Sequence, residues 1–140
     1  MGTRIHVVKR HVEYGDSGAF NYGADDFKDL LLEAGANVET QDGNDNDFEC
    51  WEDDYKTAIK VVACLANRKA DDPYRVALFK ELNICTETLV KTIHACWKND
   101  HDESHKEYDE VNAAKYVLSY MVAFYVQRDR NSGYVSFSTF

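Results

Sequence analysis

The sequence has few of the residues that interrupt a folded domain. It contains one proline and seven glycines among 140 residues, so no proline-rich linker or low-complexity tail divides it. No apolar run approaches the roughly 20 residues that span a bilayer, and the first ten residues lack the apolar core of a signal peptide. We therefore expect one cytoplasmic domain covering residues 1–140.

Basic residues are also in the minority. The chain carries 16 Lys and Arg against 25 Asp and Glu, for a net charge of -9. Proteins that bind nucleic acid through its phosphates need clustered basic side chains, so this balance disfavours direct binding to DNA or RNA. A hydrophobic content of 44% and an aromatic content of 13% favour a folded core over a disordered acidic chain.

The four cysteines form no CxxC pair of the kind that binds zinc or carries redox chemistry. Cys50, Cys64, Cys85 and Cys96 all fall within apolar helical or strand patterns. In a reducing compartment such cysteines behave as small hydrophobic residues. We therefore expect all four to be buried and unpaired.

Hydrophobic periodicity predicts an α+β fold. Alternating residues at 4–9 and 134–140 predict strands, and residues 48–51 predict a short third strand. Helical spacing predicts helices over 24–34, 51–68, 73–82, from 86 to about 97, and over 104–128. We expect a small antiparallel sheet, with the N-terminal and C-terminal strands paired, covered by four to five helices.

Local signals set several helix ends. Gly35 is a typical residue to end the first helix, and Asp72 with Pro73 is a typical helix start. Ser104 and Glu107 form a capping box that predicts the start of the longest helix. Residues 36–47 match no element, and long irregular segments are often functional.

The negative charge is local. Residues 39–54 hold eight acidic and no basic residues, whereas the rest of the chain sums to -1; residues 100–110 form a second acidic segment. Either these are solvated loops that keep the protein soluble, or they bind a basic partner that relieves their mutual repulsion. The second interpretation predicts a set of partner-binding carboxylates: Glu39, Asp42, Asp45, Asp47, Glu49, Glu52, Asp53, Asp54, Asp100, Asp102 and Glu103.

The function we predict is non-enzymatic protein binding without a cofactor. A small acidic domain can occupy the basic groove of a nucleic-acid-handling protein or complex and so compete with phosphate for it. Small phage and mobile-element inhibitors, including anti-restriction and anti-CRISPR proteins, are similar to this chain in size and charge. The aromatic residues Phe48, Trp51 and Tyr55 could anchor such a contact, although their spacing is typical of core positions.

A calcium site is an alternative prediction. The segment that starts at Asp42 resembles an EF-hand loop, with Asp42, Asn44 and Asn46 at loop positions 1, 3 and 5 and Asp53 at position 12. The pattern departs from that loop at position 6, where Asp47 stands in place of glycine. It also has aspartate where the last ligand is usually glutamate.

Two further patterns suggest chemistry. Zinc accepts histidine and cysteine ligands, and four such residues lie within twelve positions: His94, Cys96, His101 and His105. Residues 15–18, Gly-Asp-Ser-Gly, resemble the segment around the nucleophile of chymotrypsin-like proteases. No histidine lies at a spacing that would indicate a catalytic pair with Ser17. A flexible glycine turn explains the four residues better.

The third class of function is a small enzyme or a ligand-binding protein. No GxxxxGK[ST] or GxGxxG loop is present to bind nucleotide phosphates. A small anionic ligand could instead be held near His6 and His11, with Tyr14 beside them. If the terminal strands pair, the basic groups there are His6, Lys9, Arg10, His11, Arg128 and Arg130. The alternative is a solvated sheet edge whose positive charge discourages aggregation.

Overall fold

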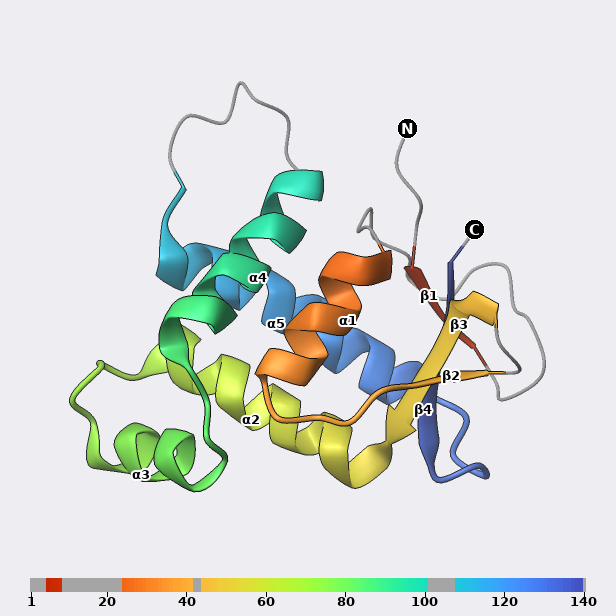
Figure 1. Cartoon of the computed structure of the whole chain (residues 1–140), viewed down its shortest axis with the longest axis horizontal. Coiled ribbons are helices and arrows are strands. Elements are labelled where there is room, and N and C mark those ends of the chain that lie inside the picture. Colours follow the sequence, from red (N-terminus) through yellow and green to blue (C-terminus); the bar gives the residue numbers. More distant parts are fainter. Residues whose placement is uncertain (1–4, 9–23, 42–43, 101–107, 140) are drawn as a thin grey trace.

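The computed structural model of the chain describes residues 5–8, 24–41, 44–100 and 108–139 (Figure 1). In chain order its elements are β1 (Ile5–Val8), α1 (Ala24–Glu33), β2 (Glu39–Gln41), β3 (Asn44–Trp51), α2 (Glu52–Asn67), α3 (Pro73–Glu81), α4 (Thr86–Asp100), α5 (Glu110–Gln127) and β4 (Tyr134–Thr139). This is the α+β fold that the sequence predicts. None of the described helices combines the length and the apolar character needed to cross a membrane.

Within the described residues, the sheet has four antiparallel strands in the order β1-β4-β3-β2. The predicted pairing of the terminal strands is confirmed, with Val7 opposite Phe137. The predicted third strand is also confirmed and is longer than expected, because it begins at Asn44. In Figure 1 the sheet lies at one end of the molecule and the helices extend away from it.

A cluster of aromatic rings joins the sheet to the helices. Phe137 of β4 lies 5.1 Å from Phe48 of β3, 5.3 Å from Phe27 of α1 and 5.5 Å from Phe124 of α5, measured between ring centroids. Tyr55 of α2 completes the cluster at 5.8 Å from Phe137. These rings are all essentially buried, and such ring pairs contribute about 0.5–1.5 kcal/mol each beyond their burial.

The helices also contact one another along their lengths. α5 packs against α2 and α4, and α1 packs against α4. The predicted stop at Gly35 is confirmed, because α1 ends at Glu33 and Gly35 has a φ of 94°. The predicted start of α3 is confirmed too, because the Asp72 carboxylate accepts hydrogen bonds from the backbone N–H groups of Tyr74 and Arg75.

Three predictions need correction. The segment 36–47, expected to be irregular, contains β2 and the first half of β3. Pairing with β2 at Asn44 and with β4 at Asp47 outweighs the low strand propensity of its Asn and Asp residues. The longest helix begins at Glu110 with Asp109 as its N-cap, and the capping box at 104–107 lies outside the described residues. Cys50, Cys64 and Cys96 are buried as expected, but Cys85 is exposed.

Candidate functional site

The acidic segment 39–54 runs through β2 and β3 into the first turn of α2. Side chains alternate along β3, so Phe48 and Cys50 face the helices whereas Asp47, Glu49 and Trp51 face away from them. The same outer face carries Ser138, Ser136 and Tyr134, which are the register partners of those three residues on β4. Part of the predicted acidic loop is therefore a row of side chains on one face of the sheet, and its last three residues form the first turn of α2.

Two of these carboxylates bind to serines of the neighbouring strand. The Ser136 hydroxyl donates to Glu49 Oε1 at 3.0 Å, and the Ser138 hydroxyl donates to Asp47 Oδ1 at 2.6 Å. Glu49 is only 2% exposed. A partner cannot reach a carboxylate buried in this way, so the structure removes Glu49 from the predicted binding set.

Glu52 and Asp54 make contacts within the protein as well. Glu52 pairs with Arg128, whose guanidinium lies 3.8 Å from the centroid of the Tyr125 ring and also donates to the Tyr125 carbonyl. Asp54 accepts a hydrogen bond from the backbone N–H of Asn37 at 3.2 Å. These contacts join the start of α2 to the end of α5 and to the segment after α1. Arg128 thus binds Glu52 and is not a free member of the predicted basic cluster.

Among the described members of the predicted set, Glu39 and Asp53 are the exposed carboxylates. Asp45 lies in β3 and Asp100 ends α4, but the structure does not describe their side chains. Asp42, Asp102 and Glu103 lie outside the described residues, as do His11, Tyr14 and Ser17.

The described residues of the segment expected to bind calcium are not arranged as a calcium loop. Asn44 and Asn46 lie in an extended strand, and Asp53 lies beyond that strand in a helix. At about 3.3 Å per residue, β3 carries Asn44 well away from Asp53, whereas one ion needs all its ligands within about 2.5 Å. Asp42 lies outside the described residues.

Of the four proposed zinc ligands the structure describes only His94 and Cys96, and these form no metal site with other described residues. Cys96 is buried in the core, and this burial raises the pKa of its thiol well above the usual value. His94 is on the same helix, with its ring 4.1 Å from the Tyr108 ring, and His101 and His105 lie outside the described residues. No three described His, Cys, Asp or Glu side chains are placed to hold a metal ion.

Trp51 is the feature of the acidic segment that the sequence pattern misassigned. Helical spacing put it on the buried stripe of α2 with Tyr55, yet its side chain is 52% exposed while Tyr55 is fully buried. Its ring stacks on that of Tyr134, with centroids 4.2 Å apart and planes 25° apart. The period-two alternation of Asp47, Glu49 and Trp51 was the signal that could have placed it on the outer face.

Trp51 also occupies the N-cap position of α2. Its side chain makes no capping hydrogen bond there, whereas Ser, Thr, Asp and Asn are the residues that usually fill this position. The Glu52 N–H donates instead to the carbonyl of Gly133, at 3.0 Å. A φ of 78° at Gly133 makes glycine the favoured residue in that turn.

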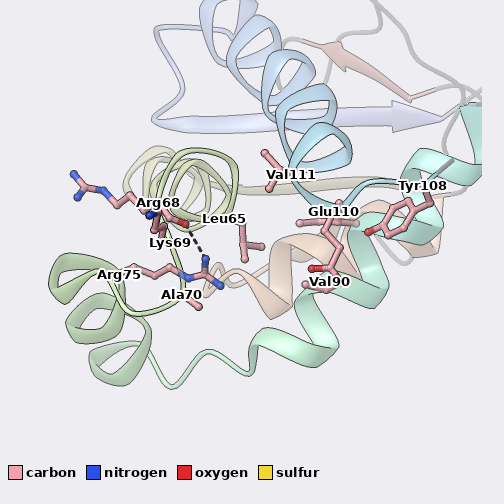
Figure 2. Close-up of a pocket in the computed structure, with 10 residues that line it drawn as sticks. Leu65, Arg68, Lys69, Ala70, Arg75, Val90, Tyr108, Glu110 and Val111 are labelled. Atoms are coloured by element: carbon pink, nitrogen blue, oxygen red, sulfur yellow. Dashed lines mark hydrogen bonds between the residues drawn. The ribbon is translucent and has the colours of Figure 1, made fainter.

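A second candidate site lies at the other end of α2, where a pocket of about 230 Å³ opens between α2, α3, α4 and α5 (Figure 2). It was not predicted, because its lining comes from segments far apart in the sequence: Leu65, Arg68, Lys69, Ala70, Arg75, Val90, Ile93, Tyr108, Glu110 and Val111. The only sequence signal was the net positive charge of the segment 55–98.

No family model matches the chain, and comparisons with curated proteins and with solved structures gave no match. Function must therefore be inferred from the geometry of these two sites.

Proposed function

We propose that the protein is a non-enzymatic binding module that docks a basic protein partner through the surface formed by Trp51, Tyr134, Glu39 and Asp53, which we name the Trp51 surface. The observation that supports this most directly is a half-exposed tryptophan inside the most acidic segment of the chain. Tryptophan is among the residues that dominate binding energy at protein interfaces. Its ring also attracts Lys and Arg side chains through cation–π contacts.

The local structure of Trp51 favours a binding role over a folding role. A serine or aspartate in its place could cap α2, and such caps contribute about 0.5–2 kcal/mol to stability. The chain instead has a large apolar residue there, with half its surface in water. Positions where a sequence breaks such a local rule are often functional. Stacking on Tyr134 holds the ring in one orientation, which reduces the entropy lost when a partner binds.

The charges on α2 would orient a basic partner. Exposed Asp53 lies in the first turn of this helix, and two cations, Lys69 and Arg75, lie just beyond its last residue. A helix of 16 residues is about 24 Å long, so the two charge clusters lie far apart. A basic protein is attracted to one end of α2 and repelled from the other, which favours contact at the Trp51 surface.

The class of partner follows from this charge pattern. Proteins that handle nucleic acid carry basic grooves, and an acidic surface with an aromatic anchor can occupy such a groove in place of phosphate. The proposed mechanism is inhibition by occupancy, as in the phage and mobile-element inhibitors that this chain resembles in size and charge. It requires no catalytic residue and no cofactor.

Affinity capture tests the proposal. The wild-type protein and the variants Trp51→Ala and Glu39→Gln/Asp53→Asn are immobilised, and each is exposed to nuclease-treated lysate of the encoding organism over a salt gradient. We expect wild type to retain a basic nucleic-acid-binding protein, which Trp51→Ala binds about 30-fold more weakly, the effect of losing about 2 kcal/mol. The double variant should release the partner at lower salt, because exposed charges act mainly on long-range attraction.

Tyr74→Ala is the matched control. Tyr74 is an exposed aromatic residue of similar accessibility, 48%, but it lies on α3. Its replacement should leave both capture and salt dependence unchanged. Equal retention of the same protein by wild type and Trp51→Ala, or capture that does not respond to salt, would show that the Trp51 surface is not the binding site.

A further inference from the structure

The pocket of Figure 2 has chemically different ends separated by apolar walls. Leu65 and Ile93 line it and are almost completely buried, and Val90 and Val111 line it as well. Its volume, about 230 Å³, falls below the roughly 300–1,000 Å³ of pockets for drug-sized ligands. The cavity is therefore suited to a small molecule with an apolar body.

Arg75 supplies a fixed positive charge at one end. One of its guanidinium nitrogens donates to the Arg68 carbonyl at 3.0 Å, as Figure 2 shows, and the group lies 5.2 Å from the centroid of the Phe79 ring. None of the described carboxylates forms a salt bridge with this guanidinium, which retains further N–H donors. Lys69 adds a second cation to the lining.

Arg68 does not share this role. Its guanidinium donates to both carboxylate oxygens of Asp72, at 3.1 and 3.2 Å, and lies 4.5 Å from the Tyr74 ring centroid. Figure 2 shows this side chain extending away from the pocket, whereas the Arg75 guanidinium points towards it. Arg75 is thus the arginine available to an anionic group.

Tyr108 and Glu110 line the opposite end. The Tyr108 hydroxyl oxygen is buried and has no hydrogen-bond partner among the described residues. Burial, with Glu110 and Asp109 nearby, raises the pKa of this hydroxyl to about 12, so it stays neutral at neutral pH and its oxygen can accept a hydrogen bond from an ammonium. The Tyr108 ring is positioned by contacts with His94 and Trp97. In Figure 2 the hydroxyl and the Glu110 side chain lie across the pocket from Arg75.

We propose that this pocket binds a small zwitterion whose anionic group meets Arg75, whose apolar body packs on Leu65, Val90 and Ile93, and whose cationic group meets Glu110 and Tyr108. A simple anion fits less well, because the Glu110 carboxylate repels negative charge at its end of the pocket. A simple cation is disfavoured in the same way by Arg75 and Lys69. Only a ligand with two separated opposite charges is matched to both ends.

A series of ω-amino acids of increasing chain length tests this proposal, because each member carries an ammonium and a carboxylate at the two ends of a methylene chain. Binding is followed by two-dimensional NMR of the isotope-labelled full chain. We expect saturable shifts confined to the lining residues, with one chain length bound most tightly. Alkyl carboxylates and alkylamines of that length, each lacking one charge, should bind at least tenfold more weakly.

The ratio of affinities for the ω-amino acid and for its singly charged analogue separates a binding role from a structural one. A residue that only stabilises the fold would not change this ratio when it is replaced. In Glu110→Gln the preference for the ω-amino acid over the matching alkyl carboxylate should fall at least fivefold. Glu87→Gln is the matched control, since Glu87 is also an exposed glutamate in the first turn of a helix, α4; it should keep the wild-type preference. Tyr108→Phe should weaken every ligand that bears an ammonium, and Arg75→Gln every ligand that bears a carboxylate.

Three results would overturn the proposal: no saturable shifts at millimolar ligand in the folded protein, equal affinity for zwitterions and singly charged analogues, or shifts away from the lining residues. The test is independent of the Trp51 surface, which lies at the other end of α2. Trp51→Ala should therefore leave zwitterion binding unchanged, and failure of either proposal leaves the other standing.

Discussion

The hydroxyl of Tyr55 is the best place to test the packing of α2 against α5. The side chain is fully buried, and the hydroxyl donates a 2.7 Å hydrogen bond to the Met121 carbonyl, which lies inside α5. Tyr55→Phe removes this bond and keeps the ring within the aromatic cluster around Phe137. The substitution therefore isolates one buried polar contact between the two helices.

The expected loss can be worked out from this geometry. A buried hydrogen bond contributes about 0.5–1.5 kcal/mol net, and leaving a partner unsatisfied would add to that. The Met121 carbonyl also belongs to the helical hydrogen-bond ladder of α5, so it is not left without a donor. We therefore expect the free energy of unfolding to fall by about 1 kcal/mol, which for a chain of this size lowers Tm by roughly 3–5 °C.

Urea denaturation followed by circular dichroism measures this loss. The midpoint should fall while the m-value stays constant, because the surface exposed on unfolding does not change. Tyr74→Phe is the control: Tyr74 is 48% exposed, and its ring can keep its contact with Arg68 without the hydroxyl. If Tyr55→Phe were as stable as wild type, the bond to Met121 would contribute nothing to the packing of the two helices.

Two further predictions concern thiols and phenols. Burial raises the pKa of Cys50 and Tyr55 above their ordinary values of 9.0 and 10.0, so the fold holds them protonated, and the free energy of unfolding should fall as the pH rises above about 9. Denaturation on both sides of that pH checks this, and an unchanged slope in Cys50→Ala would contradict the assignment. Hydrogen bonds from Thr88 lower the pKa of exposed Cys85, which iodoacetamide should therefore alkylate first. Peptide mass spectrometry tests the order, and equal rates at Cys85 and Cys96 would refute it.

The sequence predicted the parts of the fold that depend on nearby residues. Gly35 ends α1 and Asp72 caps α3 through contacts within a few positions of each, so the residue types alone were sufficient. The first residue of α5 could not be predicted from residue types alone, because Ser104 and Asp109 are both good N-cap residues. Asp109 takes the role by accepting hydrogen bonds from the N–H groups of the two residues that follow Glu110.

The parts that depend on distant residues were not predictable in this way. The Asn and Asp residues of 44–47 have low strand propensity, and they belong to β3 because that strand is paired on both sides. Asn44 lies opposite Gln41 of β2, and from Asp47 onwards β3 pairs with β4, some ninety positions later. Charge counting found the acidic segment but could not show that Glu49 is buried against Ser136. The pocket likewise needs three distant segments to meet, which no local pattern encodes.

The place of β4 in the sheet has a consequence for folding during synthesis. β4 lies between β1 and β3 in the sheet. A chain leaving the ribosome therefore completes all the described helices before β4 is available to pair with β1. β2 and β3 can pair early, but the strand that contains Ile5 and Val7 can pair only after residues 134–139 have been synthesised. Nascent chains stalled before that point should therefore show native helix content with an open sheet, and would be the form most exposed to proteases and chaperones.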